Sequence, residues 1–346
     1  MIDYYRFFSN AVFCVCFAFL ISGCSNQNLQ SDQESDELIL AAYTVPKEVY
    51  QKRIIPEFQN FWKEKTGRHV EIHQSYVGSG AQTRAILEGF DADIAALSLE
   101  DDIQQLVNKG LITHNWRDRP FNGFITGSVV VIAFRPDNPK HIQDWEDLTR
   151  DDVDVVCPNP KTSGGAKWCI LAVYGAGINH SQLNTEIPSG NHELINGIAA
   201  RIAVMNKSGR EAVTTFERGV GDVLLTYENE ALLRQQQGKD FPFLIPSRTI
   251  QIQNPVALID THVDRHNTRP VAEAFIDFLH SNKAQAAFAE FGFRPASIEI
   301  SRRYVKNFPN PESLFTVKDL GGWSHLNNFV FSSNGLWTRS YRSLNR

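Results

Sequence analysis

One turn decides how this chain folds: Asn159-Pro160-Lys161-Thr162-Ser163-Gly164-Gly165-Ala166-Lys167-Trp168. The apolar residues 153–157 before it predict a strand, and the apolar residues 168–174 after it predict a helix. Pro158 and Pro160 end the strand, because proline cannot donate to a sheet ladder. Ser163 is a favourable N-cap residue, and Gly164 and Gly165 begin the helix without side chains.

This turn has the properties of a small anion site. The first backbone N–H groups of a helix have no partner within it, and the helix dipole makes that end positive. A plain turn and cap that binds nothing is the alternative, and the stretch alone leaves both open. A second glycine turn, Val77-Gly78-Ser79-Gly80-Ala81, lies at another predicted strand-to-helix joint and favours an anion site.

The length and composition indicate a globular protein of two domains. The chain has 346 residues, of which 42% are hydrophobic and 21% charged. The net charge is −5 and no basic run occurs, so the chain lacks the electrostatic features of a nucleic-acid binder.

The N-terminus predicts export. Apolar residues 11–21 follow Arg6 and are shorter than the roughly 20 residues that a spanning helix needs, so residues 1–24 are expected to be a signal peptide. Leu20-Ile21-Ser22-Gly23-Cys24 resembles a bacterial lipobox, in which the cysteine is lipidated after cleavage. An ordinary signal peptide with an incidental cysteine is the alternative. Residues 25–36 are polar and predict a solvated tether.

Two cysteines belong to the folded part, Cys157 and Cys169. They flank the Ser163 turn, so a disulfide is conceivable in an oxidising compartment. Two buried thiols that act as small apolar side chains are favoured.

The mature chain alternates strands and helices. Strands are expected at 38–43, 70–75 and 93–97 with helices between them, which predicts a parallel sheet covered on both faces. Strand 127–134 is expected to lead into a second domain, and strand 255–259 to return from it. Ligands of such sheets bind beyond the carboxyl ends of the strands, where both glycine turns fall.

Two further segments are expected to pack on this body. Tyr50, Ile54, Phe58, Phe61 and Trp62 recur at helical spacing and predict a core-facing stripe, which Pro56 should kink. The last 35 residues hold scattered aromatics and predict a C-terminal element.

The sequence offers no catalytic or metal-binding constellation. The histidines lie apart, no Gly-x-Ser-x-Gly elbow occurs, and no nucleophile has an evident base. Carboxylate pairs such as Asp101 and Asp102 are expected to be solvated turns or caps. We therefore predict no enzyme, no metal and no cofactor. Tyr227 precedes Glu228-Asn229-Glu230 and is either a hydroxyl donor or a core aromatic.

Several motifs carry a family resemblance that covers about residues 38–331. The motifs are Ser75-Tyr76-Val77-Gly78-Ser79-Gly80, Pro158-Asn159-Pro160-Lys161-Thr162-Ser163-Gly164-Gly165-Ala166, Phe216-Glu217-Arg218-Gly219-Val220-Gly221-Asp222-Val223-Leu224-Leu225, Glu228-Asn229-Glu230-Ala231, Phe291-Gly292-Phe293-Arg294-Pro295, Leu314-Phe315-Thr316-Val317 and Gly321-Gly322-Trp323. Together they resemble the bacterial periplasmic sulfate-binding proteins, the receptors of ABC-type sulfate and thiosulfate importers.

The resemblance implies an α/β fold of two lobes, of the type II periplasmic binding class. Each lobe would be a mainly parallel sheet flanked by helices, with the ligand in the cleft between them. Residues 37–125 and 253–346, with a C-terminal helical element, would form lobe I, and residues 126–252 would form lobe II.

The resemblance also implies how a dianion is held. In the family, backbone N–H groups at helix starts, serine hydroxyls and one indole N–H bind it without a counter-cation. Carried over, the donors are the Ser79 and Ser163 hydroxyls and the amides of Gly164, Gly165 and Gly209.

Two departures from the family pattern affect selectivity. Thr44 stands where the family has aspartate, and Tyr227 stands where it has tryptophan. Both are still expected to belong to the ligand-binding site. The expected ligand is sulfate or thiosulfate; a receptor for phosphate or molybdate and a secreted ester hydrolase remain alternatives. The resemblance further implies a periplasmic monomer, anchored by lipid at Cys24, that delivers its ligand to an ABC permease in the inner membrane.

Overall fold

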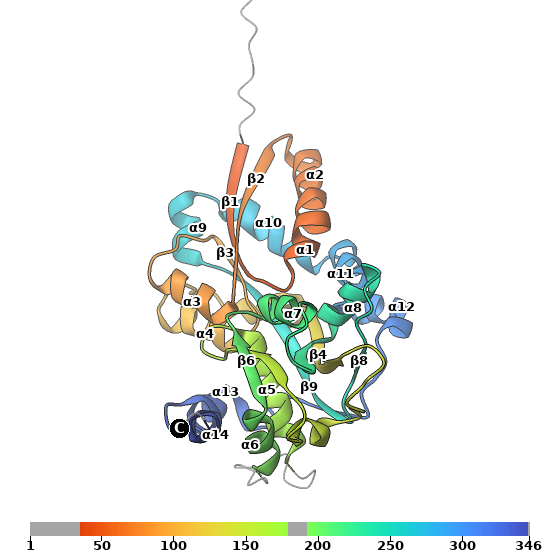
Figure 1. Ribbon diagram of the computed structural model, residues 1–346. Helices are drawn as coiled ribbons and strands as arrows, with labels where there is room; N and C mark the ends of the chain where they lie inside the picture. Colours follow the sequence, from red (N-terminus) through yellow and green to blue (C-terminus); the bar gives the residue numbers. More distant parts are fainter. Residues whose placement is uncertain (1–34, 179–191, 345–346) are drawn as a thin grey trace, which may run out of the picture. The chain divides into compact units, whose positions relative to one another are not determined.

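Two groups of parallel strands, joined by a pair of long antiparallel strands, form the core of the computed structural model (Figure 1). The model describes residues 35–178 and 192–344. We call the group β1, β2 and β3 the first lobe, and the group β5, β6 and β7 the second lobe. Their bounds are β1 Ser35–Tyr43, β2 His69–Val77, β3 Ile94–Ala96, β5 Val155–Pro158, β6 Ile202–Asn206 and β7 Val223–Tyr227.

The joining strands are β4 (Phe124–Phe134) and β9 (Arg248–Leu258). The end of β9 pairs with β3, its middle pairs with the first half of β4, and the end of β4 pairs with β7, all antiparallel. The strand order is therefore β2-β1-β3-β9-β4-β7-β5-β6. This confirms the predicted fold of two lobes with mainly parallel sheets. The lobe boundaries predicted at 126 and 253 fall inside β4 and β9 and stay a prediction.

Helices cover the strands, and three very short strands extend the sheet at its margins. The helices are α1 Lys47–Val49, α2 Ile55–Thr66, α3 Ser79–Leu87, α4 Glu100–Asn108, α5 Gly164–Ala176, α6 Glu193–Ala200, α7 Gly209–Glu217, α8 Glu228–Gln236, α9 Asp260–His266, α10 Arg269–His280, α11 Asn282–Glu290, α12 Ile298–Arg303, α13 Gly322–Leu326 and α14 Leu336–Leu344. The short strands are β8 Phe243–Leu244, β10 Arg294–Pro295 and β11 Ser313–Phe315.

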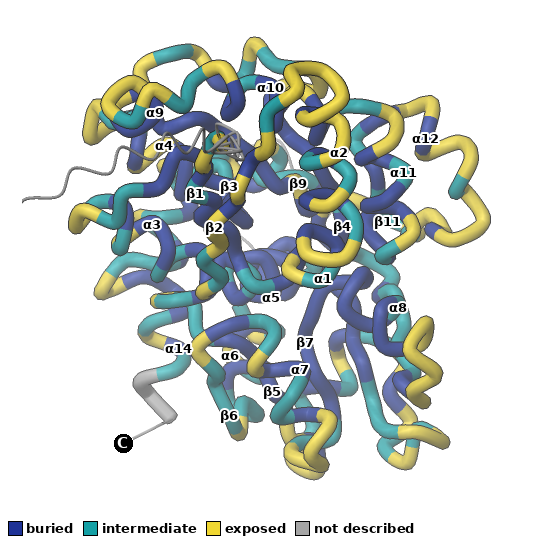
Figure 2. The backbone as a smooth tube through the Cα atoms, turned by 90° about the horizontal axis from the view of Figure 1, so that it is seen from above, coloured by how far each residue is buried: buried dark blue, intermediate teal, exposed yellow. Residues whose placement is uncertain are grey.

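Both faces of the first-lobe sheet are buried, as a parallel sheet requires. Successive side chains of a strand point to opposite faces. Leu40 of β1 accordingly joins the core cluster that contains Phe58 and Phe275, while its neighbour Ala41 joins the cluster that contains Ile86 and Ile103. Figure 2 shows β3 and most of β4 and β9 as buried, whereas the edge strand β2 has several exposed residues.

The first helical segment is interrupted close to Pro56. A single π-helical turn, Tyr50–Ile54, lies between α1 and α2, and Pro56 stands in the first turn of α2; the predicted kink stays a prediction. Phe58 is buried and meets Phe275 edge to face, with ring centroids 4.9 Å apart. Phe61, expected in the same core stripe, is 37% exposed because it lies at the margin of that contact.

The C-terminal segment packs on the second lobe, although the sequence assigned it to lobe I. Trp323 of α13 contacts Trp168 of α5 at 5.5 Å between ring centroids, and α14 lies against α6 (Figure 1). Scattered aromatics predict that a segment packs somewhere, but only the fold determines which apolar surface is open to it.

The N-terminal boundary lies earlier than predicted. β1 begins at Ser35, inside the expected tether, because Asp36 accepts hydrogen bonds from Trp62 Nε1 at 2.8 Å and from Arg68. The signal segment and Cys24 lie outside the described residues. Within those residues, none of the helices has both the length and the apolar character needed to cross a bilayer. Cys157 and Cys169 are free and buried, which confirms the prediction of two thiols.

We expect Gly175→Ala to destabilise the fold. A Cβ atom at this position of α5 would overlap the Phe315 ring, and overpacking a core costs about 1–3 kcal/mol. Gly165→Ala in the same helix is the matched control, because its Cβ would come no closer than 3.3 Å to another group. Chemical denaturation without ligand should separate the two variants; equal free energies of unfolding would contradict this packing.

Candidate functional site

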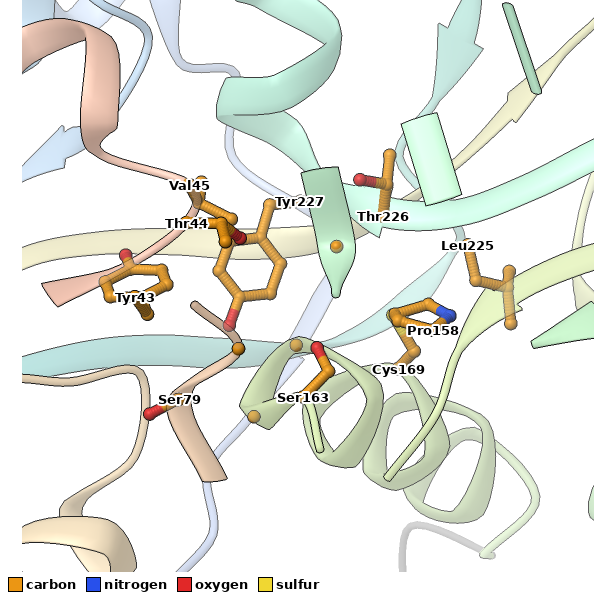
Figure 3. Close-up of a pocket in the computed structure, with 14 residues that line it drawn as sticks. Tyr43, Thr44, Val45, Ser79, Pro158, Ser163, Cys169, Leu225, Thr226 and Tyr227 are labelled. Atoms are coloured by element: carbon orange, nitrogen blue, oxygen red, sulfur yellow. The ribbon is translucent and has the colours of Figure 1, made fainter. Parts of the chain in front are cut away.

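The candidate site lies where the carboxyl ends of the parallel strands of both lobes meet. It is an enclosed cavity of about 10 Å³ (Figure 3). Drug-sized ligands occupy roughly 300–1,000 Å³, so this space suits only a compact guest. The lining residues are Tyr43, Thr44, Val45, Gly78, Ser79, Pro158, Ser163, Gly164, Gly165, Cys169, Gly209, Leu225, Thr226 and Tyr227. This is the position in which open α/β sheets bind ligands.

Three helices begin at this cavity, α3, α5 and α7. The N–H groups of Gly164 and Gly165 donate to no group in the described part of the chain, whereas Ala166 N already bonds to Ser163 O at 3.2 Å. The same holds for the first two N–H groups of α3 and of α7. Such groups point out of the helix start, so the cavity receives donors and the positive ends of three helix dipoles.

Two serines at helix starts behave differently. Ser208 caps α7, since its Oγ accepts from Glu211 N at 3.2 Å. Ser163 occupies the N-cap position of α5, as predicted, but its hydroxyl does not cap that helix. Ser163 is 3% exposed and lines the cavity. Its hydroxyl is thus available to a guest.

The glycines of the two predicted turns allow the lobes to touch. A Cβ on Gly78 would overlap Thr162 O of the second lobe, and a Cβ on Gly164 would lie 2.6 Å from Ser98 Oγ of the first lobe. Ala81 N also donates to Thr162 O at 3.2 Å. The two turns found in the sequence therefore form one site because they pack against each other.

Every ligand residue predicted for the folded part lines this cavity. The set is Thr44, Ser79, Ser163, Gly164, Gly165, Gly209 and Tyr227. None of the lining side chains carries a charge. The nearest cations already have partners: Arg210 binds Glu48 across the lobes at 2.7 Å and Lys167 binds Asp101 at 3.2 Å. Among the described residues, no cluster of His, Cys, Asp and Glu could hold a metal ion.

Asp102 lies behind the cavity and corrects the expectation of a solvated carboxylate. It is 2% exposed and accepts from Ser79 Oγ at 2.5 Å. Burial raises its pKa to about 6. Because the Ser79 hydroxyl proton is directed at Asp102, the Ser79 main-chain N–H is the donor that faces a guest here. An isolated carboxylate in a predicted turn gives no sequence signal for this contact.

Tyr227 is buried at the end of β7 (Figure 3). Its hydroxyl lies 2.7 Å from Ser98 Oγ. Burial raises the pKa of Tyr227 well above its usual 10, so the phenol keeps its proton at neutral pH. Tyr227 is therefore a neutral hydroxyl at the cavity wall as well as a core aromatic. The sequence analysis missed its partner Ser98, which belongs to neither glycine turn.

Comparison with known proteins agrees with this site. A family model described as "Bacterial extracellular solute-binding protein" matches residues 39–294. The chain belongs to the bacterial extracellular solute-binding proteins. A sulfate-binding protein of Synechococcus elongatus is 42% identical over 95% of this chain and 94% of its own. A thiosulfate-binding protein of Escherichia coli is 34% identical over 87% and 90%.

Two solved structures share the fold. The sulfate-binding protein SubI from Mycobacterium tuberculosis matches with a TM-score of 0.77 and 35% identity, over 85% of this chain and 98% of its own. A periplasmic thiamin-binding protein matches with a TM-score of 0.64 over 90% and 96%, at 15% identity, and this likeness concerns the fold alone.

We expect Gly165→Asp to abolish binding of an oxyanion such as sulfate while the protein stays folded. The new carboxylate would lie beside Ser163 and Tyr227 at the cavity and repel the anion, yet a negative charge at a helix start stabilises the helix. Gly165→Asn is the matched neutral control and should retain more affinity. If calorimetry gave Gly165→Asp and Gly165→Asn the same affinity, repulsion at this helix start would be refuted.

The buried Asp102 predicts a pH effect on stability. Its pKa is about 6 in the fold against the ordinary 3.8, so the native state binds the proton more tightly than the unfolded chain does. The free energy of unfolding should therefore fall as pH rises from about 4 to about 6, and this fall should be absent in Asp102→Asn. Denaturation curves of both proteins between these pH values check the sign; parallel profiles would contradict it.

Proposed function

We propose that this protein captures sulfate, or its analogue thiosulfate, outside the cytoplasm and delivers it to an ABC-type permease. The observation that carries the proposal is the cavity itself: seven residues expected to bind a dianion line one enclosed space, and no charged side chain lines it. The relatives named above as sulfate-binding and thiosulfate-binding proteins support the same ligand class.

The donors suit a fully deprotonated guest. Main-chain N–H groups at three helix starts can donate and cannot accept, and the Ser163 hydroxyl and Tyr227 phenol add two further protons. Hydrogen phosphate carries a proton that needs an acceptor. Leaving that proton unpaired in a buried site costs about 1–3 kcal/mol. Selectivity for sulfate over phosphate would follow from this difference.

The lobes would close on the anion and present the closed form to the permease. Closure removes water from the cavity and strengthens each hydrogen bond to the guest. A ligand that binds the closed form better shifts the population toward it. The closed form is supported by the direct bonds between the lobes around the cavity, such as that from Arg84 Nη1 to Lys161 O at 2.8 Å.

We further propose that the protein is a binding protein and not an enzyme, that it acts as a monomer without a cofactor, and that a lipid on Cys24 holds it to a bacterial membrane on the periplasmic side. The lipobox-like segment is the support for the anchor. Cys24→Ala should then move the protein from the membrane fraction to the soluble periplasmic fraction. Retention in the membrane fraction would refute the lipid anchor and would not affect the proposed binding function.

The mature protein should bind sulfate at least 100-fold more tightly than phosphate at neutral pH. An unpaired buried proton on phosphate, together with the loss of one donor bond, corresponds to roughly 3 kcal/mol. Calorimetric titration with sulfate, thiosulfate, phosphate and molybdate tests this. Equal affinity for sulfate and phosphate would refute the donor argument, and preference for molybdate or thiosulfate would reassign the ligand within the oxyanion class.

A further inference from the structure

We propose that Ser98 is a positioning residue of the anion site: its hydroxyl donates to Tyr227 Oη and so turns the phenol proton toward the guest. This inference rests on the proposed function and goes beyond it, because Ser98 lies outside the cavity lining and has no place among the predicted donors. The Ser98–Tyr227 hydrogen bond is then the contact that orients the phenol proton toward a deprotonated guest.

Ser98 stands at the centre of the contact between the lobes. It follows β3, is fully buried, and is bonded through every polar atom it has. Its N–H donates to Ser79 Oγ at 2.9 Å, and its carbonyl oxygen accepts from Trp168 Nε1 and from Asn254 Nδ2, both at 3.0 Å. Its hydroxyl is 2.7 Å from Tyr227 Oη. Three of these four bonds hold the Ser98 main chain in place, and the fourth joins its hydroxyl to Tyr227.

The Ser98 and Tyr227 hydroxyls share one hydrogen bond, and its direction has a chemical consequence. If Tyr227 donates to Ser98, the phenol offers the cavity only a lone pair, which suits a guest that carries a proton. If Ser98 donates to Tyr227, the phenol proton is left for the cavity, which suits a guest with none. A dianion accepts that proton, so its presence selects the second direction.

The surroundings favour the second direction for sulfate. The phenol remains protonated, as argued above from its burial, so one proton is always present to be directed. A chain of hydrogen bonds from Ser98 through Tyr227 to the anion polarises each member in the same sense, which strengthens the last bond. Ser98 follows β3 of the first lobe and Tyr227 ends β7 of the second, so this chain is complete only when the lobes are in contact.

A double-mutant cycle tests the inference. Ser98→Ala should weaken sulfate binding by about five- to tenfold, the usual range for one lost hydrogen bond, and should narrow the ratio between sulfate and phosphate affinities. In the Tyr227→Phe background, where no phenol proton exists, Ser98→Ala should change the sulfate affinity less than about twofold. Affinities would be measured by calorimetry on the full mature protein.

Two further variants separate positioning from packing. Ser128→Ala is the matched control, since Ser128 is also a buried serine, bonds to Asn229 Oδ1 at 3.3 Å and does not line the cavity; its sulfate affinity should match the wild type. Ser98→Cys keeps a weak donor of similar shape and should bind between wild type and Ser98→Ala. It also provides a second test if Ser98→Ala folds poorly, which its melting curve would reveal.

The outcomes are distinct. An equal loss from Ser98→Ala in the wild-type and Tyr227→Phe backgrounds would overturn the inference, because packing alone would then explain it. An unchanged affinity in Ser98→Ala, with Ser98→Cys also unchanged, would overturn it as well. Both results leave sulfate binding by the wild type in place, so the proposed function would stand. A wild type that bound none of the four oxyanions would instead remove that function, and this inference with it.

Discussion

The first N–H groups of a helix cannot be satisfied by that helix, and this constraint governs the whole site. Here α3, α5 and α7 all begin at one cavity, and their first two N–H groups find no partner among the described residues. Bringing three positive dipole ends together is unfavourable while the space between them is empty of charge. An anion removes both deficits at once, because it accepts the hydrogen bonds and neutralises the dipoles.

The strands determine that these helix starts meet. In each lobe the chain leaves a parallel strand at its carboxyl end and enters a helix, so both lobes present helix starts on the same side. β4 and β9 hold the lobes so that these sides face each other. Gly78 and Gly164 then permit contact between the backbones, since a Cβ at either position would meet the opposite lobe. The glycines are required by the contact between lobes as much as by the anion.

Much of this arrangement could be predicted from the sequence, for a physical reason. Ser79 and Ser163 each lie where a predicted strand gives way to a predicted helix, and that local pattern places them at the carboxyl ends of sheet strands. Gly209 is identified only through the family resemblance. The sequence predictions that the structure did not bear out depend on contacts between distant segments. Whether Asp102 is solvated depends on what covers α4, and whether the C-terminal aromatics reach the first or the second lobe depends on which surface is left bare. No short segment of the sequence reveals these contacts.

The contrast between local sequence patterns and contacts of distant segments also explains why Ser98 and Tyr227 must be considered together. A tryptophan N–H has one proton in a fixed direction, whereas a tyrosine O–H rotates and needs a neighbour to orient it. A tyrosine in place of the tryptophan therefore requires a second residue that orients its hydroxyl. No motif around Tyr227 reveals that residue.

The absence of charge from the cavity lining is also consistent with release of the ligand. A buried arginine or lysine facing the anion would be left as an unpaired buried charge whenever the anion departed in the closed form, which is strongly unfavourable. Neutral N–H and O–H groups are left with a smaller penalty each. Arg210 and Lys167 lie outside the cavity lining, where Glu48 and Asp101 of the opposite lobe pair with them while the lobes are in contact. A site built from dipoles can thus bind a doubly negative guest and still empty, which is what a protein that delivers its ligand must do.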